Sequence, residues 1–139
     1  MAANQLTING LDDLRRALLA LPGDLVADAS TIVKGAADAT ARDVTAAYAT
    51  VRRTGNLADH VRVDHGGSRA HATSKVLSTA RHAYLYERGS SARRRLNGAS
   101  TGTMPAANTF IPIAMARRQV MVAALIEVVE RSGLKVTGR

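Results

Sequence analysis

The sequence predicts an α+β fold: a long N-terminal helix, a small antiparallel sheet with a long Arg-rich loop, and a C-terminal helix packed on the sheet. Apolar residues recur every three or four positions over about residues 24–51, as on one face of a helix, and a second helix is expected from Pro112 to about Ser132. Between these stretches, residues 61–79 alternate, as strands do. The 139 residues match one domain, which we expect to span 1–139.

Residues 1–23 are expected to form an N-terminal helical arm. Asn9 can cap a helix with its side-chain oxygen, and two aspartates follow in the first turn, where the helix dipole favours them. Pro22 and Gly23 interrupt the pattern, so we expect a kink or a restart there. The leucines that share one face are Leu11, Leu14, Leu18, Leu21 and Leu25.

A long amphipathic helix is predicted from about Asp24 to Val51. Its apolar stripe is rich in small residues, which let another element approach closely. Thr54 and Gly55 are expected to end it, because glycine can adopt a positive φ and release the chain into the sheet. The stripe consists of Leu25, Ala29, Ile32, Val33, Ala36, Thr40, Val44, Ala47 and Val51.

After Gly55 the period changes to two, which predicts a β-hairpin. Val61 and Val63 are expected on one face, and His60, Arg62 and Asp64 on the other. The run GGS at residues 66–68 is typical of a turn, and the alternation resumes over 70–79. The following HAYLYERGS, residues 82–90, is compatible with a helical turn or with a third strand.

Residues 88–104 are predicted to form an exposed loop, because Gly, Ser and Arg dominate and no core pattern is present. The net charge of the chain is +8; residues 1–50 sum to −2 and residues 51–139 to +10. The loop holds the densest part of this charge, which favours contact with a polyanion or with an acidic neighbouring subunit. The arginines concerned are Arg88, Arg93, Arg94 and Arg95.

The final helix is expected to begin with Pro112 at its first position, to run to about Ser132 and to stop at Gly133. Phe110, the only Phe, is expected to anchor it to the core. The segment 120–129 is apolar on nearly every side. Since such a helix requires burial on more than one face, we expect a subunit interface here.

No pattern in the sequence indicates catalysis. The absence of cysteine excludes disulfides and thiolate sites, and the four histidines have no zinc-ligand spacing. No P-loop, dinucleotide fingerprint or nucleophile elbow is present. We therefore expect no enzyme, no cofactor or metal, and no small-molecule substrate. The N-terminus lacks a signal-peptide pattern and the longest apolar run is too short to cross a membrane, so a soluble protein is expected.

Three segments, taken in order, resemble the small neck proteins of long-tailed bacteriophages, the head–tail joining or tail-completion family. They are TGNL at 54–57, HAYLYERGS at 82–90, and the stretch from Met104 to Ala114, which ends in FIPIA. The resemblance covers roughly residues 25–130. The positions that carry it are Thr54, Gly55, Leu57, Ala83, Glu87, Gly89, Pro105, Phe110, Pro112 and Ala114. Departures from the family pattern are His82, Tyr86, Ser90 and Ile113.

The resemblance implies a structural virion protein, assembled in the host cytoplasm, that forms a homo-oligomeric ring. In this family the ring is commonly hexameric and lies between a head-side connector or stopper protein and the tail tube. DNA passes through such a ring, so a basic loop can touch it nonspecifically. An alternative is a small basic nucleic-acid-binding protein. The expected subunit or partner interface comprises Glu87, Arg88, Arg93, Arg94 and Arg95.

Glu87 itself has two interpretations. It can accept hydrogen bonds from a neighbouring backbone or pair with an arginine, as a charged acceptor in an assembled fold does. Alternatively, Glu87 and Gly89 only shape a local turn.

Overall fold

The computed structural model describes residues 23–51, 55–68 and 71–133. Helices and two antiparallel hairpins make up this part of the chain, which confirms the predicted α+β class. The elements are α2 (Gly23–Thr50), α3 (Asn56–Asp59), β1 (Val61–Ser68), β2 (His71–Ser78), α4 (Ala83–Arg88), β3 (Ser90–Arg94), β4 (Ser100–Met104) and α5 (Phe110–Arg131). The arm expected over residues 1–23 lies, apart from Gly23, outside the described residues, as does Thr54.

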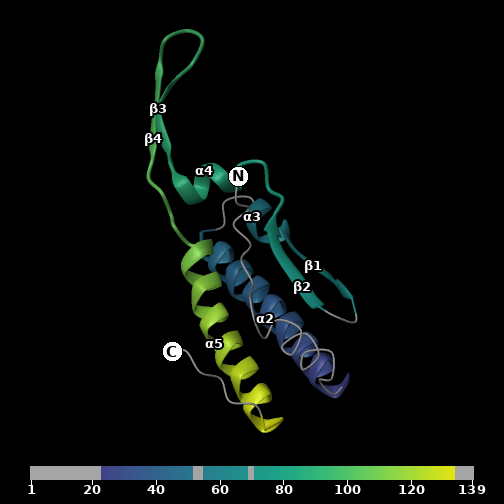
Figure 1. The fold of residues 1–139 in the computed structure, drawn as a ribbon. Coiled ribbons are helices and arrows are strands. Elements are labelled where there is room, and N and C mark those ends of the chain that lie inside the picture. Colours follow the sequence, from purple (N-terminus) through teal and green to yellow (C-terminus); the bar gives the residue numbers. More distant parts are fainter. Residues whose placement is uncertain (1–22, 52–54, 69–70, 134–139) are drawn as a thin grey trace, which may run out of the picture.

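Helices α2 and α5 lie side by side and form the body of the molecule (Figure 1). The predicted bounds of the long helix are confirmed to within one residue at each end. An ion pair between Arg117 on α5 and Asp43 on α2 joins the two helices. The buried residues of α2 lie three or four positions apart on one face: Ala37, Thr40, Val44 and Tyr48. Of these, only Thr40 and Val44 belong to the predicted stripe. The rest of that stripe is half-buried, except for Val51, which is 50% exposed and lies beyond the end of the helix.

The β1–β2 hairpin also packs on α2. Val61 and Val63 are half-buried while Arg62 and Asp64 are exposed, which confirms the predicted alternation within β1. His60, expected on the exposed face, is half-buried. The turn expected at 66–68 is wrong, because β1 continues to Ser68, which pairs with His71. A glycine is needed at Gly67 because a Cβ there would lie 2.6 Å from the carbonyl oxygen of His71. The glycines therefore mark a close approach of two strands.

The change from helix to strand takes place around Gly55. This residue is buried and has φ 78°, which confirms the positive φ expected for it. It precedes the single turn of α3, and Leu57 within that turn is half-buried. Helix α3 packs against α2, so the chain reverses direction before β1 begins.

Residues 90–104 form a second hairpin, β3–β4, where the sequence predicted a loop without regular structure. Ser90 pairs with Met104 and Arg93 with Gly102, with bulges between the pairs. The hairpin projects from the body beyond α4 (Figure 1). Residues 91–103 are exposed, as expected for this segment. Because no side chain there contributes to a core, the apolar alternation that reveals a strand is missing.

Helix α5 begins at Phe110, two residues earlier than predicted, so Pro112 is its third residue. Proline is tolerated there because the first-turn N–H groups have no acceptor within the helix. Its end at Arg131, followed by Gly133 with φ 85°, agrees with the prediction. The helix packs mainly along α2 and not on the sheet as expected. Its part from Phe110 to Met121 borders β2, where Ala114 and Val76 line a shared groove.

Candidate functional site

Glu87, in the last turn of α4, is the point at which three helices meet. Its Oε2 accepts a hydrogen bond from the backbone N–H of Thr109 at 2.8 Å, and both of its oxygens accept from that of Phe110 at 3.1 Å. The hydroxyl of Tyr48, on α2, donates to Oε1 at 2.8 Å. An ionised carboxylate only accepts hydrogen bonds, and every one of these partners is a donor.

The carboxylate of Glu87 acts as the N-terminal cap of α5. Thr109 occupies the cap position but makes no side-chain hydrogen bond to the helix, so Glu87 binds the free N–H groups in its place. A negative charge at this end also interacts favourably with the helix dipole. Of the interpretations of Glu87 given above, the structure supports acceptance of backbone hydrogen bonds; its oxygens are engaged within the chain.

Tyr48 completes this junction from the α2 side. Its side chain is only 2% exposed, and its ring meets that of Tyr86 edge-on, with centroids 5.6 Å apart and planes at 89°. Burial, followed by the hydrogen bond to the Glu87 carboxylate, raises the pKa of Tyr48 well above its usual range. The hydroxyl therefore remains a donor to Glu87 at any ordinary pH.

The segment 105–109, which leads into α5, runs alongside α4 and is bonded to it. The N–H of Ala107 donates to the carbonyl of Tyr86 at 3.0 Å, and that of Asn108 to the carbonyl of Glu87 at 3.2 Å. Gly89 has φ 75°, and a Cβ there would lie 2.6 Å from the carbonyl oxygen of Met104. Gly89 thus permits both the backbone conformation and the close approach of this segment.

The structure brings together part of the motif set predicted from the sequence. Glu87 and Gly89 from the second motif segment contact the approach to α5, which includes Pro105 and Phe110 from the third. Ala83 is buried at the start of α4, and on α5 Ala114 is half-buried and Pro112 exposed. Gly55 and Leu57 lie apart from these residues, at α3, and Thr54 is outside the described residues.

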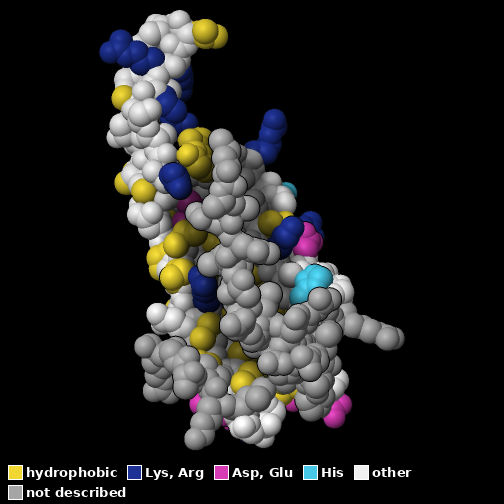
Figure 2. All heavy atoms as spheres, in the orientation of Figure 1, with side chains coloured by type: hydrophobic (Ala, Val, Ile, Leu, Met, Phe, Trp, Pro, Cys, Tyr) yellow, Lys and Arg dark blue, Asp and Glu magenta, His cyan; other side chains and the backbone are white. Residues whose placement is uncertain are grey.

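The predicted arginines separate into two places. Arg88 lies over the ring of Tyr84, with its guanidinium carbon 5.6 Å from the ring centroid. The other three, Arg93 to Arg95, are exposed on the projecting hairpin, and Figure 2 shows Lys and Arg side chains along it. Within the described ranges none of these arginines takes part in an ion pair. Their charge is therefore free to meet an outside partner.

An open cleft lies beside the Glu87 junction. Tyr84 is 67% exposed and Ile111 66% exposed, and both line the cleft together with Arg88. Phe110 is half-buried and borders this cleft and the groove shared by α2, β2 and α5. Large exposed apolar side chains close to one another are typical of surfaces that bind other proteins.

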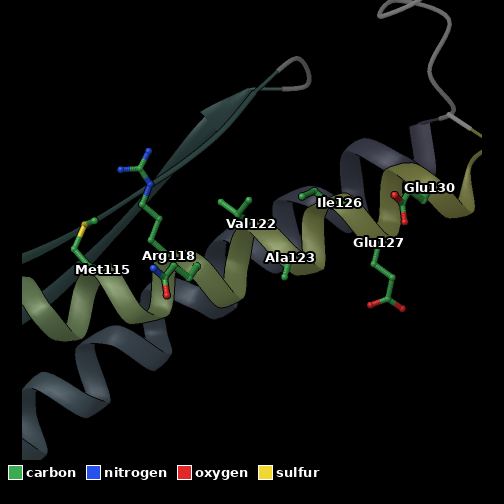
Figure 3. Close-up of a pocket in the computed structure, with 8 residues that line it drawn as sticks. Met115, Arg118, Val122, Ala123, Ile126, Glu127 and Glu130 are labelled. Atoms are coloured by element: carbon green, nitrogen blue, oxygen red, sulfur yellow. The ribbon is translucent and has the colours of Figure 1, made fainter. Parts of the chain in front are cut away.

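A second exposed surface, here called the α5 groove, runs along the outer side of α5 (Figure 3). Its centre is apolar, and Met115 and Val122 are 50% and 43% exposed. Arg118 lies toward its N-terminal part, and two glutamates lie at its C-terminal end. The residues that line it are Met115, Arg118, Gln119, Val122, Ala123, Ile126, Glu127 and Glu130. This groove falls within the helix that the sequence predicted to form a subunit interface.

The histidines take part in local hydrogen bonding. Nε2 of His65 lies 3.1 Å from Oδ1 of Asp38, and its Nδ1 lies 3.0 Å from the hydroxyl of Ser74. His60 Nδ1 lies 2.8 Å from the carbonyl of Asn56. Over residues 23–51, 55–68 and 71–133, no three His, Asp or Glu side chains gather as metal ligands would. Nor does any helix in these ranges have the length and apolar character needed to span a membrane.

Two contacts of the site were missed by reasoning from the sequence. Tyr48 follows Val44 by four positions and so lies on the buried face of α2, a spacing that could have identified it. The Asp43–Arg117 pair joins residues 74 positions apart, and no local pattern indicates it.

The chain matches no protein-family model, no curated protein and no solved structure.

Proposed function

We propose that this chain is a structural virion protein of a bacteriophage neck. Copies of it form a ring, of six subunits as is common in the family it resembles, that completes the tail end and joins it to the head-side connector. The tail tube protein and the connector or stopper protein are its partners on the two faces of the ring. DNA passes through the ring, and any contact with it is independent of its base sequence.

One observation carries this proposal: two of the three segments on which the resemblance rests meet at Glu87. Glu87 belongs to HAYLYERGS, and the N–H of Phe110 that it binds belongs to FIPIA, 23 positions later. Spaced residues that contact one another in the fold are harder to attribute to chance than spaced residues that do not. This contact therefore supports the view that the two motif segments occur together because the fold requires both of them.

The exposed surfaces also support a role in assembly. Few apolar side chains of the described residues are buried, and those that are buried are Ala37, Val44, Tyr48, Ala80, Ala83 and Val128. Large apolar side chains remain exposed at the cleft beside Tyr84 and along α5. A protein that leaves such surfaces uncovered is typically one subunit of a larger assembly.

The test is electron microscopy of particles produced without this chain. We expect filled heads and finished tails to accumulate separately, and we expect the wild-type chain supplied in trans to restore complete particles. If complete particles form normally in its absence, the proposal is wrong.

A small basic nucleic-acid-binding protein is the second candidate, and the exposed arginines of the hairpin favour it. A binder of bare DNA loses affinity steeply as salt rises, by about 0.9 logarithmic units per phosphate contact for each tenfold change in salt. Replacing Arg93, Arg94 and Arg95 by alanine is then expected to reduce this slope by about 3. A neck protein is expected to bind bare DNA weakly and to depend on its protein partners.

A further inference from the structure

We propose that the tip of the β3–β4 hairpin binds in the α5 groove of a second copy of this chain. Leu96 at the tip fills the apolar centre of the groove, between Val122 and Ile126. The arginines beside it face Glu127 and Glu130 at the acidic end. This inference rests on the part of the proposed function in which the chain forms a ring, and it specifies the contact between neighbouring subunits.

The hairpin tip presents a large apolar side chain in a fixed position. The side chain of Leu96 is fully exposed. The turn that carries it is closed by two backbone hydrogen bonds, from Arg95 to the carbonyl of Ala99 at 2.8 Å and from Gly98 to that of Arg95 at 2.9 Å. The side chain of Asn97 accepts a third, from Ala99 at 3.2 Å. Such a turn loses little conformational freedom when its leucine enters a partner.

The α5 groove offers the complementary chemistry. Val122, Ala123 and Ile126 provide an apolar centre, and Glu127 and Glu130 follow within one turn of helix (Figure 3). In the described part of the chain, neither glutamate takes part in an ion pair. The three arginines of the hairpin are equally unpaired. Opposite charges left free on two surfaces favour their association and fix its orientation.

Charge also distinguishes the α5 groove from the other exposed apolar surface. The cleft beside Tyr84 is lined by Arg88. Of the described residues that line it, Glu87 is the one carboxylate, and it is already engaged by the start of α5. An arginine-rich tip is therefore repelled there. Among the described residues that line the α5 groove, the one cation is Arg118, which lies toward the opposite end from the glutamates. The hairpin arginines consequently favour the C-terminal end of the groove.

The placement of the two surfaces makes the contact intermolecular. The hairpin extends from α4 away from the body, and the C-terminal half of α5 lies at the opposite end of the molecule (Figure 1). Seven residues of strand and turn, from Ser90 to Leu96, reach about 20 Å. Since the tip and the groove are different surfaces, each copy can bind one neighbour through its hairpin tip and a second neighbour through its α5 groove. Such head-to-tail contacts close into a ring when the rotation between copies permits.

The chain contains no cysteine, so cysteines introduced in pairs report the contact directly. Full-length chains carrying Leu96→Cys and Val122→Cys are mixed under mild oxidation over a range of concentrations. We expect the mixed disulfide to form in excess of either homodimer. A chain that carries both cysteines is expected to give a ladder of covalent oligomers, because each copy then has one donor and one acceptor position.

The matched control is Val120→Cys, which lies on the same helix and is 62% exposed but does not line the groove. Equal pairing of Leu96→Cys with positions 120 and 122 overturns the proposal. So does a groove cysteine that becomes reactive only after residues 1–22 are deleted, because the chain's own N-terminal segment then covers the groove.

Charge reversal tests the electrostatic part of the contact. The double variants Arg94→Glu with Arg95→Glu, and Glu127→Arg with Glu130→Arg, are each expected to reduce disulfide formation by about tenfold or more. Combining a reversed hairpin on one chain with a reversed groove on the other is expected to restore it. Failure of this rescue, with both variants folded by circular dichroism, counts against the proposed pairing.

The outcome is separable from that of the proposed function. The cysteine experiment uses purified chain, and the particle experiment uses its absence from infected cells. A specific pairing of positions 96 and 122 without any defect in particles leaves the interface in place and removes the neck function. A defect in head–tail joining without this pairing supports the neck function and overturns the proposed interface.

Discussion

The hydroxyl of Tyr48 donates a 2.8 Å hydrogen bond to the carboxylate of Glu87, across 39 positions of sequence. The same carboxylate accepts from the first N–H groups of α5. One side chain on a six-residue helix therefore joins the end of one long helix to the start of the other. The four predictions that follow test how much of the fold depends on contacts of this kind.

Replacing Glu87 by glutamine is expected to lower the free energy of unfolding by about 1–3 kcal/mol. Glutamine keeps the size but has a single acceptor oxygen and no charge for the helix N-terminus. Chemical denaturation followed by circular dichroism measures this change. The exposed carboxylate of Asp28 provides the control, and Asp28→Asn is expected to change stability by less than about 0.5 kcal/mol. Equal stabilities for Glu87→Gln and the wild type contradict the prediction.

Tyr48→Phe retains the ring and its edge-on contact with Tyr86 while removing the donor to Glu87. We expect a loss of about 1.5 kcal/mol, since a hydrogen bond to a charged acceptor is lost. In a double-mutant cycle with Glu87→Gln, the two effects are expected to be smaller together than their sum. Tyr84→Phe, at an exposed ring, is the control. Additive effects show that the Tyr48 hydroxyl does not act through Glu87.

Gly89→Ala is expected to destabilise the fold more than Gly98→Ala. Both glycines have positive φ, 75° and 80°, so both substitutions carry a conformational cost of about 1–3 kcal/mol, and the ψ of −177° at Gly89 places it in a region that is essentially restricted to glycine. A methyl group at Gly89 also meets the backbone of Met104 and Ala106, whereas the space at Gly98 is open. The difference in unfolding free energy between the two variants therefore reports the close contact together with the glycine-specific backbone conformation at Gly89. Equal unfolding free energies for the two variants contradict the prediction, and mean that the segment after β4 can move away from residue 89 at no cost.

The Asp43–Arg117 pair is expected to make stability depend on pH in the acid range. The Arg117 guanidinium bonded to Asp43 holds the pKa of that carboxyl below its ordinary value of 3.8. Because the folded pKa is the lower one, the stabilisation is present above pH 3.8 and is lost as the pH falls below it. Unfolding curves at neutral pH and below pH 3.8 are expected to show a larger loss for the wild type than for Asp43→Asn. An equal loss in both means that the pair contributes nothing.

The elements that were predicted from the sequence are those with one buried face, because that face requires apolar residues at a regular spacing along the chain. The bounds of α2 follow from its stripe, and the alternation of Val61 and Val63 identifies β1. The turn at residues 66–68 was misplaced because glycine permits a close strand contact as well as a turn. The β3–β4 hairpin has no buried face, so its strands carry no period at all.

The candidate site was predicted only in part for a different reason. Glu87 was identified, but its partners Thr109 and Phe110 come 22 and 23 positions later, and backbone donors have no sequence signature. The α5 groove lies in a helix that was expected to form a subunit interface, because its segment 120–129 is apolar on nearly every side. Leu96 was not singled out, because one leucine in a polar segment shows nothing until the fold places it at a tip.

The projecting hairpin has a consequence for how this protein can change over time. Residues 91–103 bury nothing within the chain, whereas the junction at Glu87 is fixed by contacts inside it. Replacing an exposed side chain of the hairpin therefore removes no packing within the chain, and selection on such side chains acts through what the hairpin contacts. The length and charge of the β3–β4 hairpin can therefore change when its binding partner changes, while the rest of the fold is conserved.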